Sequence, residues 1–186
     1  TLFRSVVGDT GKGLTELFDA RGQADLITGT LGKAFSGAMG GFTTGHKEII
    51  DLLRQRSRPY LFSNSLPPMI VNAALRTFEM LENSNKLHEK LWDNTRFFKE
   101  GMHNAGFDIK PSGSAILAVM LYDAKLAQKF AARLLDEGIY VIGFFYPVVP
   151  KGQARVRVQI SAAHARQHLE KALQAFIKVG KEMHVI

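Results

Sequence analysis

Residues 155–160 read Arg-Val-Arg-Val-Gln-Ile and alternate strictly between polar and apolar side chains. Successive side chains of a β-strand point to opposite faces of its sheet. Arg155, Arg157 and Gln159 therefore share one face of a predicted strand, and the three apolar residues share the other. Two arginines on a face opposite three apolar residues favour a cleft over an exposed strand edge.

The segments around this strand indicate a layered fold. The run from Ala115 to Leu121 is continuously apolar, as in a buried strand. The remaining predictions are a helix over 123–137 that ends at Gly138, a strand over 139–142, and an amphipathic helix over 165–183. Strands that alternate with helices are typical of an α/β or α+β layer structure. We predict the α/β class.

The preceding half of the chain alternates short apolar runs with glycine-rich and polar turns. We expect a strand that ends over 25–28, a short strand over 42–44, a helix over 47–56 and a loop over 58–65. Pro67 and Pro68 suit the first turn of a helix that runs to about Glu82. Its predicted buried stripe consists of Ile70, Ala74, Phe78 and Leu81. A further helix is predicted over 86–104, with Gly106 ending it.

Composition excludes several classes of function. Hydrophobic residues make up 46% of the 186 residues and charged residues 22%, as in globular proteins. The chain has no cysteine, so disulfides and thiolate metal sites are impossible, and we assign no metal ligands. No apolar run approaches the roughly 20 residues of a membrane helix, so we predict no membrane partner. The chain opens on Thr1 without a signal peptide, and we expect it to be a piece of a longer protein.

The formal net charge of +7 raises the question of nucleic acid. The densest basic cluster is Arg54-Gln55-Arg56-Ser57-Arg58, and the other basic residues are scattered among acidic ones. No zinc-finger spacing or aromatic RNA-binding signature accompanies them. A basic cleft for an anionic small substrate would explain the charge equally well. We predict no nucleic-acid partner.

One lysine lies in a setting that suits covalent chemistry. The stretch 25–34 reads Asp-Leu-Ile-Thr-Gly-Thr-Leu-Gly-Lys-Ala. Lys33 follows apolar and small residues, and we expect it to be shielded from water, which favours the neutral, nucleophilic amine. Thr28 and Thr30 offer hydroxyls to an anion, and Gly29 and Gly32 let backbone approach it. An aldehyde that is also a phosphate ester, pyridoxal phosphate, fits this combination.

Two other interpretations compete with this one. A lysine beside glycines is often part of a surface turn, and the local pattern alone does not decide between the two. A nucleotide-binding P-loop fails on spacing, because it needs a glycine five positions before its Gly-Lys pair and a hydroxyl residue after it. Ile27 and Ala34 occupy those places. Another Gly-Lys pair, Gly11-Lys12, has Val6 and Gly13 there and fails too.

The motif over 28–34, followed by Gly40-Gly41, resembles the cofactor-lysine motif of the α-oxoamine synthases. These are fold-type I pyridoxal phosphate enzymes that condense an amino acid with an acyl-CoA. Two longer blocks, 54–65 and 143–157 with the following Ser-Ala-Ala-His at 161–164, are similar to the branch of that family that joins glycine to acetyl-CoA. The resemblance extends over nearly the whole chain from Gly8 onward.

The resemblance implies a role for each matching residue. Lys33 would form the Schiff base with pyridoxal phosphate and then remove a proton from cofactor-bound glycine. Thr30 and Gly32 would bind the cofactor from the same loop. Ser63 and Asn64 would reach the cofactor phosphate of the neighbouring subunit, in a homodimer with a shared active site, although both are also ordinary turn residues. Arg157 would grip the substrate carboxylate.

The resemblance further implies an activity and a division of the chain. The activity would be a pyridoxal phosphate-dependent acyl transfer that gives 2-amino-3-oxobutanoate and CoA from glycine and acetyl-CoA, within threonine breakdown. The predicted parts are the end of the large cofactor domain over 1–64, linking helices over 65–105, and a small C-terminal α/β domain over 106–186. The compartment would be the bacterial cytoplasm or the mitochondrial matrix.

One motif of the family has no counterpart in the chain. The family carries the sequence Asp-Asp-Ser-His upstream of the lysine motif. When this motif is aligned with the chain, Thr1 falls at its serine and Leu2 at its histidine, so both aspartates would precede residue 1. One of these aspartates partners the pyridine nitrogen of the cofactor. We therefore expect the chain alone to be inactive. Two alternatives stay open: a sister synthase with another acyl-CoA or amino acid, and a non-catalytic fragment that only associates with a full-length partner.

Overall fold

The computed structural model describes residues 6–34 and 39–186. Thr1 and Leu2, the two positions compared with the upstream motif, lie outside the described residues. The chain divides into two compact units, residues 1–88 and 89–186. The boundary falls inside a helix, between His88 and Glu89. The predicted division into three parts stays a prediction.

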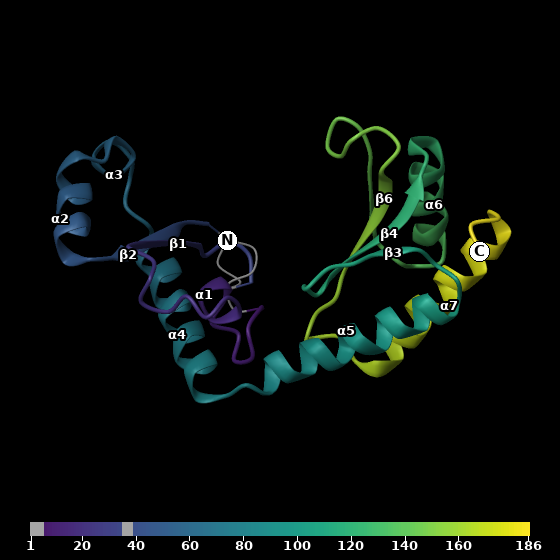
Figure 1. Cartoon of the computed structure of the whole chain (residues 1–186), viewed down its shortest axis with the longest axis horizontal. Coiled ribbons are helices and arrows are strands. Elements are labelled where there is room, and N and C mark those ends of the chain that lie inside the picture. Colours follow the sequence, from purple (N-terminus) through teal and green to yellow (C-terminus); the bar gives the residue numbers. More distant parts are fainter. Residues whose placement is uncertain (1–5, 35–38) are drawn as a thin grey trace. The chain divides into compact units, whose positions relative to one another are not determined.

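The first unit is built on a two-stranded antiparallel sheet and one long helix (Figure 1). Its elements are α1 (Leu14–Leu17), β1 (Leu26–Thr30), β2 (Gly41–Gly45), α2 (Lys47–Arg56), α3 (Arg58–Phe62) and α4 (Pro68–Asn83). The strands pair along their whole length, from Leu26 opposite Gly45 to Thr30 opposite Gly41. The segment that joins them carries Lys33. The hairpin therefore positions the lysine motif at one end of the sheet.

Aromatic packing holds this sheet on α4. The Phe42 ring of β2 meets the Phe78 ring of α4 edge to face, with centroids 5.8 Å apart. The same Phe42 ring lies over Gly29, where an added Cβ would come within 2.4 Å of it. Of the predicted stripe on α4, Ala74 is buried and the other three residues are half-buried. The stripe is confirmed in position, with less burial than expected.

The prediction of a loop over 58–65 is wrong for its first part, because Arg58–Phe62 form the short helix α3. Pro59 lies in the first turn, where its fixed φ suits a helix and its missing N–H leaves no bond unmade. The amides of Tyr60 and Leu61 both donate to the Ser57 carbonyl at 3.0 Å. The predicted helix over 47–56 is confirmed with the same bounds as α2.

The loop before α1 is organised by one carboxylate. Glu16 accepts hydrogen bonds from the Thr10 amide at 3.1 Å, the Thr10 hydroxyl at 2.6 Å, the Lys12 amide at 2.9 Å and the Arg21 guanidinium at 2.7 Å. Desolvation raises the pKa of Glu16, but these donors outweigh it and lower the pKa to about 2. Glu16 therefore stays ionised through mildly acidic pH and fixes this loop.

The second unit is a four-stranded antiparallel sheet with helices (Figure 1). Its elements are most of α5 (Lys86–Asn104), then β3 (Ile109–Lys110), β4 (Ile116–Tyr122), α6 (Ala124–Asp136), β5 (Ile142–Phe144), β6 (Ala154–Gln159) and α7 (Arg166–Glu182). The strand order is β3-β4-β6-β5. In β6 the valines are buried while Arg157 and Gln159 are exposed, so the predicted alternation is confirmed.

The predicted strand over 139–142 is displaced, because β5 begins only at Ile142. Gly138 adopts φ +79°, which ends α6, and the Ile139 amide then donates to the Leu134 carbonyl at 2.8 Å. Ile139 thus belongs to the helix terminus rather than to the sheet. The two-residue strand β3 was not predicted, because two residues show no periodicity.

Four phenylalanines form the core of the second unit. Phe98 of α5, Phe130 of α6, Phe176 of α7 and the loop residue Phe107 meet with ring centroids between 5.8 and 6.3 Å apart. Phe98, Phe130 and Phe176 are completely buried. The apolar face of the sheet packs on α6 so closely that a Cβ on Gly143 would lie 3.0 Å from the Ala127 carbonyl. This unit has the better-formed core of the two.

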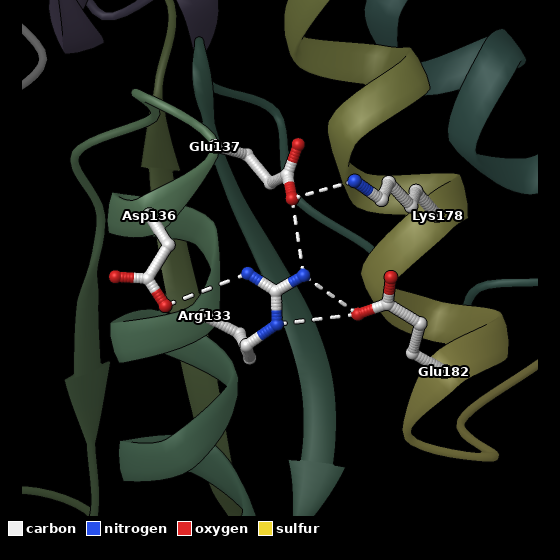
Figure 2. A network of polar contacts seen from close by, with 5 residues as sticks. All are labelled: Arg133, Asp136, Glu137, Lys178 and Glu182. Atoms are coloured by element: carbon white, nitrogen blue, oxygen red, sulfur yellow. Dashed lines mark hydrogen bonds and ion pairs between the residues drawn. The ribbon is translucent and has the colours of Figure 1, made fainter.

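A charged network joins α6 to α7 (Figure 2). The Arg133 guanidinium donates to Glu182 at 2.8 and 3.2 Å and to Glu137 at 3.0 Å. Lys178 donates to the same Glu137 oxygen at 2.8 Å. The bonds from Lys178 and Arg133 lower the pKa of Glu137. Arg133 therefore links two helices through one planar group, a task that suits guanidinium.

We expect Arg133→Ala to lower the free energy of unfolding by about 1 kcal/mol, because the network is partly exposed. A double-mutant cycle with Glu182→Ala should give a coupling of about 0.5–1 kcal/mol that shrinks in high salt. Arg96→Ala is the control, since its ion pair with Asp93 is exposed and lies within one helix. Equal losses for Arg133→Ala and Arg96→Ala in urea titrations would contradict this role.

Candidate functional site

The lysine loop closes on itself through backbone and hydroxyl bonds. The Leu31 amide donates to the Gly40 carbonyl at 2.9 Å, which continues the pairing of β1 and β2 by one residue. The Thr30 hydroxyl donates to the same carbonyl at 3.5 Å and accepts from the Gly32 amide at 3.4 Å. The Leu31 side chain is buried. Thr30, Gly32 and Lys33 are thus held together on one short segment.

The expectation that Lys33 is shielded from water is wrong for the described residues, because its side chain is exposed. Gly32 and Ala34 on either side are exposed as well. The sheet that carries the loop has two strands, β1 and β2. Among residues 6–34 and 39–186, the Lys33 amine has no hydrogen-bond or ion-pair partner. The amine is therefore unoccupied by other described groups and accessible to a carbonyl compound.

Gly29 differs from its predicted use, whereas the contacts of Thr30 are compatible with binding a phosphate. Gly29 is required by the Phe42 ring that lies over it, so packing rather than the approach of an anion explains this glycine. The bonds of the Thr30 hydroxyl within the loop, at 3.4 and 3.5 Å, are long and weak. An incoming phosphate oxygen could replace either bond at small cost.

Ser63 and Asn64 follow α3 in the first unit, in the irregular segment before α4. Both are exposed. Large aromatic side chains precede them, with Tyr60 65% and Phe62 79% exposed. The Arg58 guanidinium lies 5.7 Å from the Phe62 ring centre. This part of the chain presents polar groups beside uncovered aromatic surface.

Arg157 lies in the second unit, on the exposed face of β6. Its guanidinium lies 4.2 Å from the centre of the Phe144 ring on the neighbouring strand β5. In the part of the chain that the structure describes, no carboxylate pairs with it. Stacking orients a guanidinium without using its N–H donors. Arg157 can therefore present both donors of one edge to a carboxylate.

The predicted site residues thus fall into three groups. Thr30, Gly32 and Lys33 share the hairpin loop, Ser63 and Asn64 share the segment after α3, and Arg157 stands on the second unit. Phe144 was missed by the sequence analysis. Its contact with Arg157 depends on the pairing of β5 with β6, which no local pattern reveals.

Comparison with known proteins places the chain in a family. The profile of the family "Aminotransferase class I and II" matches residues 6–176. The chain belongs to this family. This family contains pyridoxal phosphate-dependent enzymes, and membership in it confirms the predicted α/β fold class.

Two curated relatives show which members of the family the chain is similar to. The 2-amino-3-ketobutyrate coenzyme A ligase of Escherichia coli K12 is 55% identical over 97% of the chain and 45% of its own length. The 8-amino-7-oxononanoate synthase of Thermosipho melanesiensis is 47% identical over 97% of the chain and 46% of its own length. The chain therefore spans a little under half the length of these relatives. The resemblance to the α-oxoamine synthases is confirmed.

A solved structure carries the same fold. A high-resolution structure of SPT with a PLP internal aldimine superposes on the whole chain with a TM-score of 0.94 and 32% identity, over 47% of its own length. The cofactor belongs to that protein.

Among the helices that the structure of the present chain describes, none has the length and apolar character to span a membrane.

Proposed function

We propose that the chain is the lysine-bearing part of a glycine C-acetyltransferase. The observation that carries the proposal is 55% identity to a 2-amino-3-ketobutyrate coenzyme A ligase over nearly the whole chain. In this reaction a C–C bond forms between the α-carbon of glycine and the acetyl carbonyl carbon. The thioester C–S bond breaks, the α-proton leaves, and CoA departs with its sulfur protonated. The product is 2-amino-3-oxobutanoate.

The residues of the hairpin loop fit pyridoxal phosphate. Lys33 offers an accessible amine with no described partner, as an aldehyde requires. Thr30 and Gly32 lie three residues and one residue before it, respectively, and would approach the phosphate from the same loop. When bound, this cofactor would supply the electron sink that stabilises negative charge on the α-carbon of glycine. Lys33 would hold it and then take up the α-proton.

Arg157 would bind the glycine carboxylate through two parallel N–H bonds. The Phe144 ring at 4.2 Å supports this role, because it fixes the plane of the guanidinium. Arg54 and Arg56, both exposed on α2, are our candidates for the phosphates of CoA. These assignments rest on charge and on the resemblance of the sequence blocks.

We infer a homodimer with a shared active site. Ser63 and Asn64 would reach the cofactor phosphate of the neighbouring subunit. The exposure of Tyr60 and Phe62 beside them supports this proposal, since aromatic surface of this extent is commonly buried in an interface. The compartment would follow the source of the chain, cytoplasm in bacteria and mitochondrial matrix in eukaryotes.

A sister synthase is the second candidate, favoured by the 47% identity to an 8-amino-7-oxononanoate synthase. A sister synthase would prefer another amino acid or a longer acyl-CoA as its substrate. The third candidate is a fragment that only associates with a full-length partner, since the chain spans under half of its relatives.

A substrate panel tests the proposal. The panel uses the longer protein that contains this chain and follows CoA release with a thiol reagent. We expect glycine with acetyl-CoA to give the largest kcat/KM, at least about tenfold above any other amino acid paired with a longer acyl-CoA, since one pocket contact is worth roughly 1–3 kcal/mol. Preference for such another pair would favour the sister synthase. No turnover with any pair, despite bound cofactor, would favour the non-catalytic fragment.

A further inference from the structure

The second unit contains a cavity of about 370 Å³ that none of the predicted site residues lines. It lies between the turn after α6, the end of β6 and the first turns of α7. Its accessible apolar wall includes Ile139, Val141 and Ala172, which are all half-buried. Its polar wall includes His164, His168 and Lys171. Of the described residues that line it, none carries a carboxylate.

Backbone bonds fix the proton positions on both histidines. The Ser161 amide donates to Nδ1 of His164 at 3.3 Å, and the Ala165 amide donates to Nδ1 of His168 at 3.3 Å. An amide N–H can only donate, so each Nδ1 is an acceptor and each neutral ring carries its proton on Nε2. The two rings therefore offer two Nε2–H donors, with centroids 6.5 Å apart.

This arrangement disfavours a metal ion. A metal on Nε2 would require the proton on Nδ1, where the backbone amides already donate. The described residues contain no group of three potential ligands for a metal. Burial, followed by the charge of His168, lowers the pKa of His164, which keeps that ring neutral near pH 7. A hydrogen-bond acceptor suits these donors better than a cation.

Lys171 adds one positive charge to the same wall. Its Nζ would lie 3.5 Å from a Cβ built on Gly138, which places the ammonium over the turn after α6. No acid or carbonyl among the residues that the structure describes pairs with it. The turn opposite is firmly held, because the buried Asn94 side chain donates to the Ser161 and His164 carbonyls at 3.0 Å each. These bonds hold the turn that carries His164 in place.

We propose that this cavity binds a small organic monocarboxylate with an apolar body. One ammonium matches one negative charge, two Nε2–H donors match carboxylate oxygens, and the apolar wall of Ile139, Val141 and Ala172 accepts a hydrocarbon group. The site shares no residue with the proposed pyridoxal phosphate chemistry. The proposal of a carboxylate site is therefore independent of the proposed function.

Octanoate is a suitable probe, and the Cε1–H signals of His164 and His168 report on the cavity in NMR spectra of the purified protein. We expect both signals to shift and saturate with octanoate, at a Kd below about 10 mM. Lys171→Met should weaken binding about fivefold, as for an exposed charge pair. Lys181→Met is the matched control, an exposed lysine of the same helix, and should bind octanoate unchanged.

Two comparisons complete the test. The uncharged 1-octanol should bind at least about fivefold more weakly than octanoate, because it lacks the charge that Lys171 matches. The Lys33→Ala protein should bind octanoate as the unaltered protein does, which separates this site from the proposed function. Absence of a saturable shift, equal binding of 1-octanol, or equal weakening by the two lysine variants would overturn the proposal.

Discussion

Lys33→Ala is expected to remove covalently held pyridoxal phosphate and to lower glycine-dependent CoA release by at least about 1000-fold. A positioned general base alone contributes about 10²–10⁴ to a rate, and this variant also loses the amine that holds the cofactor. The measurement is the absorption band of the protein with added pyridoxal phosphate, followed by the thiol assay. Both should fall together.

Lys12→Ala provides the matched control, because Lys12 also follows a glycine and lies in the same unit as Lys33. Its amide, and not its side chain, bonds to Glu16, so the loop should survive the change. Methylamine added to the Lys33→Ala protein should restore part of the activity, which a merely structural role would not allow. An absorption band that persists in Lys33→Ala, or that vanishes in Lys12→Ala, would refute the assignment of Lys33.

Much of the secondary structure followed from local pattern. The helix α5 has the predicted bounds because its apolar spacing and Gly106, with φ +99°, both lie within the segment itself. The alternation in β6 correctly assigned its two faces, since the period of a strand is a property of the backbone. The helix α3 was missed because Pro59 within an aromatic run reads as a turn, although it suits a first helical turn equally well.

The residues of the candidate site come from sequence motifs and their roles stay predictions, whereas their surroundings could not be predicted from the sequence. The loop that carries Thr30, Gly32 and Lys33 follows from one short motif, whereas exposure of Lys33 depends on which groups lie over that loop. Among the described residues, none covers the Lys33 side chain. Gly29 illustrates the same limit, because the Phe42 ring that demands it comes from the partner strand. A local sequence motif identifies the functional groups of the loop. It does not identify the distant residues that pack against them in the folded chain.

Arg157→Lys is expected to lower kcat/KM for glycine about 30- to 150-fold, mainly through a higher KM. Lysine keeps the charge but cannot donate two parallel bonds to a carboxylate or stack on Phe144 in the same way. Loss of a charge-assisted hydrogen bond costs about 2–3 kcal/mol, which corresponds to this factor. The test is the dependence of initial rate on glycine concentration at saturating acetyl-CoA.

Arg155→Lys is the control on the same face of β6, since its guanidinium bonds to the Gln153 carbonyl at 2.9 Å instead of stacking on Phe144. It should change kcat/KM less than about threefold, within the range of a surface substitution. Phe144→Leu should raise KM for glycine by about three- to tenfold, because it removes an orienting contact worth roughly 1 kcal/mol and leaves the arginine in place. Equal losses for Arg155→Lys and Arg157→Lys would show that charge on this face, and not a two-point grip by Arg157, binds the substrate.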